Sequence, residues 1–479
     1  MTPRMASQPT RQARRLGHWL LPIAMAAFLT ACASVPLPST GKLPDTVPTQ
    51  WSAGAANAAV APTELAAWWQ RFDDPALVAL VVKALDANTS LKSTQAALRQ
   101  ARALAEVQQA RLGPSLGLSA SAQRSDTGIT DANNAFKASA SASWEPDLFG
   151  GNGASAKASE ADAQASAASL SSVQVSLAAE VASSYINLRG LQTRLTIARS
   201  NLAAQAETLQ ITRWRAQAGL VSSLDVAQAV SAAEQTQAQI PTLQSSESQA
   251  LNALAVLTGQ VPGTLKATLS DASPIPTAPA DLALAFPADT LRQRPDVRAA
   301  ELKVHSALSR MAAADAARYP SFNLSGSIGL SSLTLGALTD GASVVRSLLA
   351  SVSLPLLDGG AAKAQVRAQE AALDQARVAL EGTVLTALQD VEDALVAIQG
   401  NSERLMRLQA AASAAANAEL LARQRYESGL IDFTTVLSTQ RTLLSAQDSV
   451  AATQANLSAD HVRLYKALGG GWQPEATAR

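Results

Sequence analysis

The sequence predicts a mainly α-helical chain that also contributes strands to a membrane β-barrel. Three observations support this fold class: a duplicated unit of domain size, two very long helical segments, and short segments with strict two-residue alternation. Alternation between an apolar face and a small polar face is typical of barrel strands with a wet lumen. Four such strands cannot close around a lumen, so we expect several copies of the chain to share one barrel.

The duplication is visible in three pairs of turns that recur in the same order. Their offsets are 206, 209 and 210 residues. The pairs are Pro114 with Pro320, Pro146 with Pro355, and Gly219 with Gly429. Because this period is far longer than that of solenoid repeats, each unit is a duplicated structural domain.

Each unit is expected to contain a short helix, two strands, a long helix and a return helix. The helices are predicted at about 88–112, 155–217, 222–257, 295–318, 361–427 and 432–468. The strands are predicted at about 115–122, 136–144, 322–331 and 344–354. A return helix and a short helix together match one long helix of roughly 95–100 Å, so we expect them to stack end to end beside it.

The long helices and the alternating strands each have a simpler interpretation. A heptad stripe on the second long helix, running from Val384 to Leu405, also fits an ordinary coiled coil. The alternating strands also fit a half-buried soluble sheet. The polar strand faces are rich in serine rather than charge, and each hairpin lies between helices too long for a globular domain. Both features favour the barrel.

The predicted organisation covers the whole chain. It comprises a lipoprotein signal peptide (1–31), a lipid-anchored equatorial segment (32–87), the first repeat (88–261), a linker or equatorial segment (262–294), the second repeat (295–468) and a tail (469–479).

The amino-terminal region predicts a covalent lipid. Arginines precede an apolar run from Trp19 to Leu29, which is too short to span a bilayer, and small residues then precede Cys32, the only cysteine. We expect the mature chain to begin at a lipidated Cys32, with Ala33 favouring sorting to the outer membrane of a Gram-negative cell. The alternative is an ordinary signal peptide or membrane anchor with a chance cysteine.

Composition and motifs argue against several functions. Lys+Arg and Asp+Glu both number 38, so the net charge of zero gives no reason to expect nucleic acid as a partner. The three histidines are isolated, and the sequence contains no HExxH, CxxC or GxSxG motif. The glycines at 150–153 follow a strand but lack the lysine of a phosphate loop. We therefore expect no enzyme activity, no metal and no cofactor besides the lipid on Cys32.

Four motifs occur in order: the lipobox, Trp-Trp-Gln-Arg-Phe-Asp-Asp-Pro at 68–75, Arg-Pro-Asp-Val-Arg-Ala-Ala-Glu at 294–301, and Tyr-Glu-Ser-Gly at 426–429. With these, the chain resembles the TolC-like outer-membrane factor family, specifically the NodT-type lipoproteins of tripartite efflux pumps. The resemblance implies a homotrimer with a twelve-stranded β-barrel in the outer membrane and a long α-helical barrel in the periplasm.

The resemblance also implies partners and a function. A periplasmic adaptor (membrane fusion) protein would join the channel to an inner-membrane pump of the RND type, and drugs or other small molecules would leave passively. A type I protein-secretion channel shares the same fold and is one alternative. A periplasmic coiled-coil structural or adaptor lipoprotein is another, although adaptors carry one helical hairpin and this chain has two. The sequence does not identify the exported substrate, the pump or the adaptor.

In related proteins, residues just after the second glycine turn close a periplasmic aperture. The resemblance implies this role for Thr434, Ser438 and Arg441, with Leu224 and Asp432 as further candidates. The helix-tip turns are expected at Gly219-Leu220 and Gly429-Leu430. Relatives often carry aspartate at the position of Ser438 and leucine at that of Thr434. Because this chain departs from both, the sequence does not decide whether the aperture is tightly closed at rest. At the aperture, Arg441 would pair with Asp432, pair with Asp225 or stay unpaired. The alternative is that Arg441 is simply a solvated helix residue with no role in closure.

Overall fold

The computed structural model describes Trp51 and residues 65–126, 128, 132–278 and 294–472. Cys32 and the rest of the predicted signal segment lie outside these residues. The described residues divide into two compact units, one containing 104–126, 128, 132–160 and 305–374, the other containing 51, 65–103, 161–278, 294–304 and 375–472. Within the described residues, no helix combines the length and hydropathy needed to cross a membrane.

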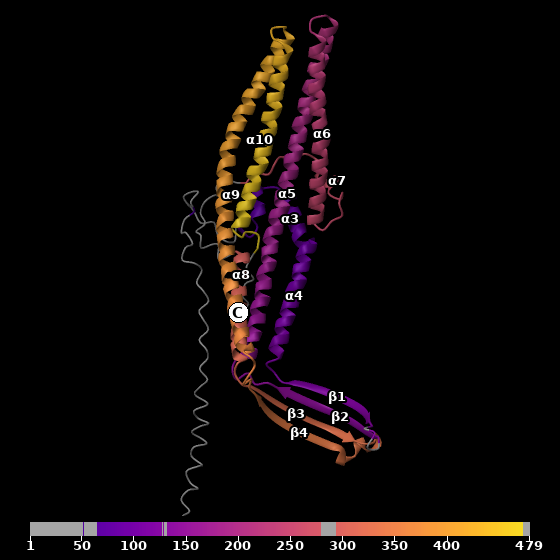
Figure 1. The fold of residues 1–479 in the computed structure, drawn as a ribbon. Coiled ribbons are helices and arrows are strands. Elements are labelled where there is room, and N and C mark those ends of the chain that lie inside the picture. The colour runs from indigo at the N-terminus through magenta and orange to yellow at the C-terminus, as the bar shows by residue number, and fades with distance from the viewer. Residues whose placement is uncertain (1–50, 52–64, 127, 129–131, 279–293, 473–479) are drawn as a thin grey trace, which may run out of the picture. The chain divides into compact units, whose positions relative to one another are not determined.

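The first unit contains the predicted strands as one antiparallel sheet (Figure 1). The strands are β1 (Ser115–Ser125), β2 (Asn133–Trp144), β3 (Ser321–Ser332) and β4 (Val344–Ser353), in the order β1-β2-β3-β4. The central β2–β3 pair joins the two repeats, because β2 belongs to the first repeat and β3 to the second. The outer edges of β1 and β4 carry no partner strand among the described residues.

The sheet has one apolar and one hydroxyl-rich face, as the alternation predicts. On the apolar face, Leu118 is 87% exposed and Leu348 is 81% exposed, so this surface is not covered within the chain. On the other face, serine hydroxyls meet across the strands, with Oγ–Oγ distances of 2.8 Å for Ser115–Ser143 and 3.1 Å for Ser119–Ser139.

The turn after β2 begins the long helix α5 (Gly151–Gln217) four residues earlier than the sequence predicts. Asp147 explains the difference, because its carboxylate accepts hydrogen bonds from the backbone N–H groups of Asn152 (3.2 Å) and Gly153 (2.6 Å). The same carboxylate occupies the N–H groups that a phosphate would need. Asp358 holds the start of α9 (Ala361–Glu427) in the same way, and these bonds lower its pKa.

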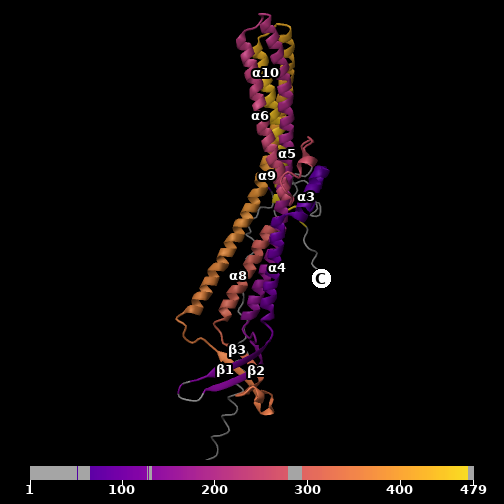
Figure 2. The same cartoon turned by 90° about the vertical axis from the view of Figure 1, so that its right-hand side faces the viewer.

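The second unit contains most of the helical hairpins (Figures 1 and 2). Each long helix of 67 residues is followed by a return helix of 35, α6 (Ser223–Leu257) after α5 and α10 (Phe433–Ala467) after α9. The short helices are α4 (Thr89–Ala110) and α8 (Pro295–Ala316). Smaller pieces are η1 (Trp68–Phe72), α3 (Pro75–Ala87) and α7 (Lys266–Leu269).

The predicted heptad stripe on α9 faces inward, with Val384, Val391 and Leu395 buried. α5 and α10 approach each other closely at Gly190. A Cβ at Gly190 would lie only 2.9 Å from that of Ala455, so Gly190, the one glycine of α5 beyond its first turn, permits this approach. Thin, alanine-rich helices thus pack through small residues as well as through the stripe.

The return helices meet the short helices end to end, as the length arithmetic predicts. At the first junction, Asn88 directly before α4 donates from Nδ2 to the carbonyl oxygen of Leu257 at the end of α6 (2.9 Å). At the second junction, Arg294 directly before α8 donates from Nη1 to the carbonyl oxygen of Ala467 at the end of α10 (2.7 Å). Each junction therefore satisfies a carbonyl that a helix end leaves without a partner.

The Trp-Trp segment packs beside the second junction. Trp68 is fully buried and stacks on Tyr465 of α10, with ring centroids 5.0 Å apart. Asp74 caps α3 through the N–H groups of the following turn and also accepts from the hydroxyl of Tyr185 (2.9 Å). Burial raises the pKa of Tyr185 to about 12. The described part of the expected equatorial segment is thus fixed to the helices.

Gly259 and Gly219 provide a matched test of the first junction. Both have φ near +70°, but a Cβ at Gly259 would lie 2.6 Å from the carbonyl oxygen of Ala87, whereas nothing lies within 4 Å at Gly219. We expect Gly219→Ala to lower the free energy of unfolding by about 1 kcal/mol, the cost of a left-handed alanine. Gly259→Ala should cost about 2–4 kcal/mol because the junction must also shift.

The midpoints of thermal unfolding of the two variants, purified in detergent, measure the difference. Equal midpoints would show that the junction at Gly259 tolerates a side chain and is not tightly packed.

Candidate functional site

The two helix tips have the same turn geometry. Two residues after the end of each long helix lies a glycine with φ of +74°, Gly219 or Gly429. The N–H of the next residue, Leu220 or Leu430, returns to a carbonyl five residues earlier, at 2.8 Å in both turns. This is the Schellman arrangement, which leaves both leucine side chains 73% exposed. The sequence located both turns correctly.

A small core holds the second tip together. Tyr426 at the end of α9 packs edge-to-face against Phe433 at the start of α10, with centroids 5.8 Å apart. The remaining buried members are Ala229, Ala232, Ala422, Val436 and Leu437. Since Ala229 and Ala232 belong to α6, the core joins the tips of both hairpins.

Arg215 of α5 links the first hairpin to the second. Its guanidinium lies 4.3 Å from the ring centroid of Tyr426 and donates to the carbonyl oxygen of Glu427 at 2.7 Å. The hydroxyl of Tyr426 lies 3.2 Å from that of Thr212, also on α5. The end of α9 is therefore fixed by a cation–π contact and two hydrogen bonds from its neighbour.

The structure places three candidate aperture residues on one face of α10. Thr434, Ser438 and Arg441 follow at helical spacing and are all exposed, whereas the opposite face carries buried Phe433 and Val436. Leu224, which the repeat aligns with Thr434, is 63% exposed in the first turn of α6. These positions form an exposed stripe over a packed tip, and their role in closing an aperture stays a prediction.

The two acidic candidates for pairing with Arg441 are placed elsewhere. Asp225 accepts from the N–H and hydroxyl of Ser222 in a capping box, at 2.9 and 2.8 Å. Asp432 precedes α10, about 13 Å along the helix from Arg441. Among the described residues of one chain, Arg441 makes no hydrogen bond or ion pair, so neither predicted pairing forms there, and its role stays a prediction.

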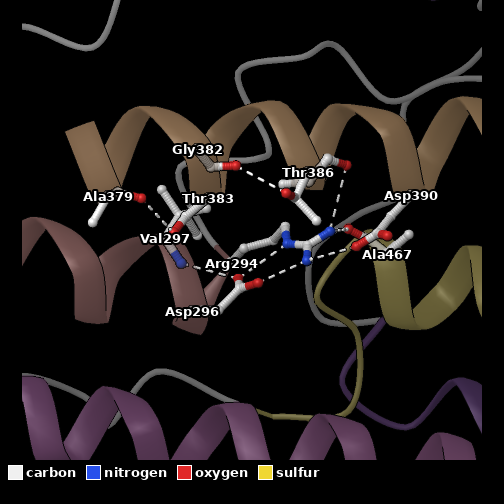
Figure 3. A network of polar contacts seen from close by, with 10 residues as sticks. Arg294, Asp296, Val297, Ala379, Gly382, Thr383, Thr386, Asp390 and Ala467 are labelled. Atoms are coloured by element: carbon white, nitrogen blue, oxygen red, sulfur yellow. Dashed lines mark hydrogen bonds and ion pairs between the residues drawn. The ribbon is translucent and has the colours of Figure 1, made fainter. Parts of the chain in front are cut away.

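Figure 3 shows the polar contacts of Arg294, the first residue of the motif at 294–301, whose partners the sequence does not predict. Its buried guanidinium bonds Asp296 at 3.0 and 2.7 Å, Asp390 of α9 at 3.2 Å, and the last carbonyl of α10 at Ala467. Burial works against its charge, but the two aspartates outweigh burial and raise the pKa of Arg294. Burial likewise opposes the charge on Asp296, yet Arg294 holds the pKa of Asp296 below its usual range.

Sequence reasoning also missed Arg215. The repeat contained a signal, because arginine occurs at equivalent positions, 215 and 425, before both glycine turns. Their roles differ, since Arg215 contacts the second tip. No signal in the sequence alone showed that the partner would be Tyr426.

The fold and the tips define a class of protein. A duplicated helical hairpin, joined to an amphipathic four-stranded sheet with open edges, is the architecture of a subunit of an outer-membrane channel that extends into the periplasm. The outer membrane efflux protein model matches residues 80–260 and 286–470. The chain belongs to this family, whose members are channels rather than enzymes.

Curated relatives match over nearly their full length. The chain is 31% identical to the toluene efflux pump outer membrane protein TtgF of Pseudomonas putida, covering 94% of this chain and 96% of the relative. It is 32% identical to nodulation protein T of Rhizobium leguminosarum bv. viciae, covering 96% and 94%. The expected kinship with NodT-type efflux proteins of the outer membrane is confirmed.

Solved structures agree. The chain matches the outer-membrane channel OprN with a TM-score of 0.83 and 32% identity, covering 91% of this chain and 99% of that one. It matches the open state of the Neisseria gonorrhoeae MtrE channel with a TM-score of 0.83 and 28% identity, covering 91% and 98%. The predicted fold class is confirmed, and the protein is an outer-membrane efflux channel protein.

Arg294 and Arg194 offer a matched comparison of two ion pairs. Arg194 pairs with Asp448 between α5 and α10, but both side chains are about one-third exposed. We expect Arg294→Met to lower the free energy of unfolding by about 2–3 kcal/mol, because it leaves carboxylates and a helix-end carbonyl without their donor. Arg194→Met should cost less than about 1 kcal/mol.

The pH dependence gives a second readout. Because the folded chain lowers the pKa of Asp296, its stabilisation is complete above the pKa of an unfolded aspartate, about 4, and is lost as pH falls through the folded value. Thermal unfolding in detergent from pH 7 to pH 3 should show this loss in the unchanged protein and not in Arg294→Met. Parallel pH profiles would contradict the assignment.

Proposed function

We propose that the protein is the passive outlet of a tripartite efflux system, working as a homotrimer. The open sheet is the observation that supports a trimer. Within the described residues, β1 and β4 each pair on one side only, and the apolar face is uncovered. A sheet with free edges is not tolerated in lipid, so further copies must complete it. Strands of 10 to 12 residues match the length that a tilted membrane strand needs.

The helical hairpins would form the periplasmic part of the duct. A periplasmic adaptor (membrane fusion) protein would connect their tips to an inner-membrane pump of the RND type, which supplies the energy. The cargo would be drugs or other small molecules. The toluene efflux relative supports small molecules over the proteins that a type I secretion channel exports.

Anchoring would come from a covalent lipid on Cys32 in addition to the strands. The lipobox before this residue supports the modification, and no other cofactor is proposed. The exposed stripe of Thr434, Ser438 and Arg441 would narrow the periplasmic aperture. Three symmetry-related Arg441 side chains would repel one another unless acids of other subunits or bound anions neutralise them.

A planar-bilayer experiment tests the proposal. The mature protein is purified in detergent, its native mass and lipid content are determined, and its conductance is recorded in the same preparation. A trimer carrying lipid and forming stable channels is the expected result. A monomer without conductance would overturn the trimeric channel, and an unlipidated trimer would overturn only the role of Cys32.

A charge reversal tests the aperture. Arg441→Glu should raise single-channel conductance, because it reverses the one charge of the exposed stripe and so removes any pairing of Arg441 with acids of other subunits or with bound anions. Lys466→Glu, the same change at an exposed site near the other end of α10, serves as the control and should leave conductance unchanged. Equal conductance of Arg441→Glu and the unchanged channel would remove Arg441 from the aperture.

A further inference from the structure

The hydroxyl-rich face of the sheet carries almost no charge. The four strands contain no Asp or Glu, and only three charged residues, all cations: Arg124, Lys137 and Arg346. Serine pairs such as Ser327–Ser347, with oxygens 2.8 Å apart, satisfy one another across the strands. Any fixed charge on this face therefore acts against a neutral background.

The register separates the three cations. Lys137 pairs with Ser121 on β1 and with Ser331 on β3, so it lies on the hydroxyl-rich face. Arg124 pairs with Asn134, and Arg346 pairs with Ile328, which places both arginines on the apolar face. Lys137 is thus the one charged residue of the hydroxyl-rich face within the described strands.

Within the described residues, no direct contact neutralises Lys137. Its side chain is exposed, and it makes no hydrogen bond or ion pair with any described residue. It lies seven residues, about 23 Å, from the end of β2 next to the helices. At that end, Asp147 and Asp358 are already engaged with the backbone N–H groups that begin α5 and α9.

We propose that Lys137 is a selectivity-determining residue of the outlet and gives the duct a preference for anionic solutes, such as carboxylates and phosphates. The inference rests on the proposed function, in which the hydroxyl-rich face lines the lumen and the trimer contributes three copies of Lys137. A ring of like charges raises the local concentration of the opposite ion in a pore. Serine hydroxyls beside it bind solutes weakly, so the ring biases passage without trapping the solute.

Salt concentration should control the preference. The Debye length is about 30 Å at 0.01 M salt and about 3 Å at 1 M, so the lysine ring acts across the lumen only in dilute salt. The test measures the reversal potential of single channels in planar bilayers under a KCl gradient. Lys137→Gln should lower the chloride-to-potassium permeability ratio by roughly twofold in dilute salt, and Lys137→Glu should lower it further.

Two controls isolate the position of the charge. Arg346→Gln makes the same change in net charge on the apolar face and should leave the permeability ratio unchanged. Lys137→Arg keeps the charge and should preserve the ratio. Conductance at 1 M salt shows that each variant still assembles into an open channel.

The outcomes distinguish a failure of the role of Lys137 from a failure of the proposed channel function. An unchanged ratio in Lys137→Gln, in channels that conduct normally, overturns the role of Lys137 and leaves the duct intact. If Arg346→Gln changes the permeability ratio as much as Lys137→Gln does, the role of Lys137 is also overturned. The effect would then not depend on which face of the sheet carries the charge. Absence of conductance from the unchanged protein would instead overturn the proposed function.

Discussion

The helical part of the structure depends on closing two helix ends against two helix starts. A helix leaves its last carbonyls without donors, and a buried carbonyl without a donor is costly. At each junction the residue before the short helix supplies the donor: Asn88 to Leu257, and Arg294 to Ala467. A glycine with positive φ, Gly259 or Gly469, then turns the chain away. A return helix and a short helix thus serve as one continuous rod, and each rod can accompany a helix of 67 residues.

The duplicated junctions have diverged in their chemistry. The first is neutral: an amide donates one hydrogen bond. The second is ionic, because Arg294 also holds Asp296 and reaches Asp390 on the neighbouring long helix. The second junction therefore fastens α8, α9 and α10 together, whereas the bond from Asn88 fastens α4 to α6 alone. The hairpin of α9 and α10, whose tip carries the predicted aperture residues, has the stronger attachment at its base.

Much of this architecture was predictable from the sequence because it follows from periodicity and from turn residues. The strands, the return helices and the end-to-end stacking follow from alternation, from Gly219 and Gly429, and from matching lengths. The sequence predicts the start of α5 four residues too late. The Asp147 carboxylate extends the helix through Gly153, although glycine has a low helix propensity.

The partners of the arginines were not predictable in the same way. Arg294 and Asp390 are separated by 96 residues, and Arg215 and Glu427 by 212, so no local pattern brings them together. For Arg441 the sequence offers two acids, and neither pairs with it among the described residues of one chain. Asp225 is occupied by Ser222, and Asp432 lies too far along the helix. Such pairings are properties of the packed helices, which only the three-dimensional arrangement reveals.

The two tips show how the same duplication yields unequal ends. The first return helix begins with a capping box between Ser222 and Asp225 that satisfies its first N–H groups. The second begins at Asp432, whose side chain makes no capping bond, so its start is held by the packing of Phe433 on Tyr426. Tyr426 is itself positioned by Arg215 of the other hairpin. The first turn of α10, which begins the exposed stripe, is therefore held more by contacts that lead back to α5 than by a cap of its own. These contacts couple the position of the second tip to that of the first.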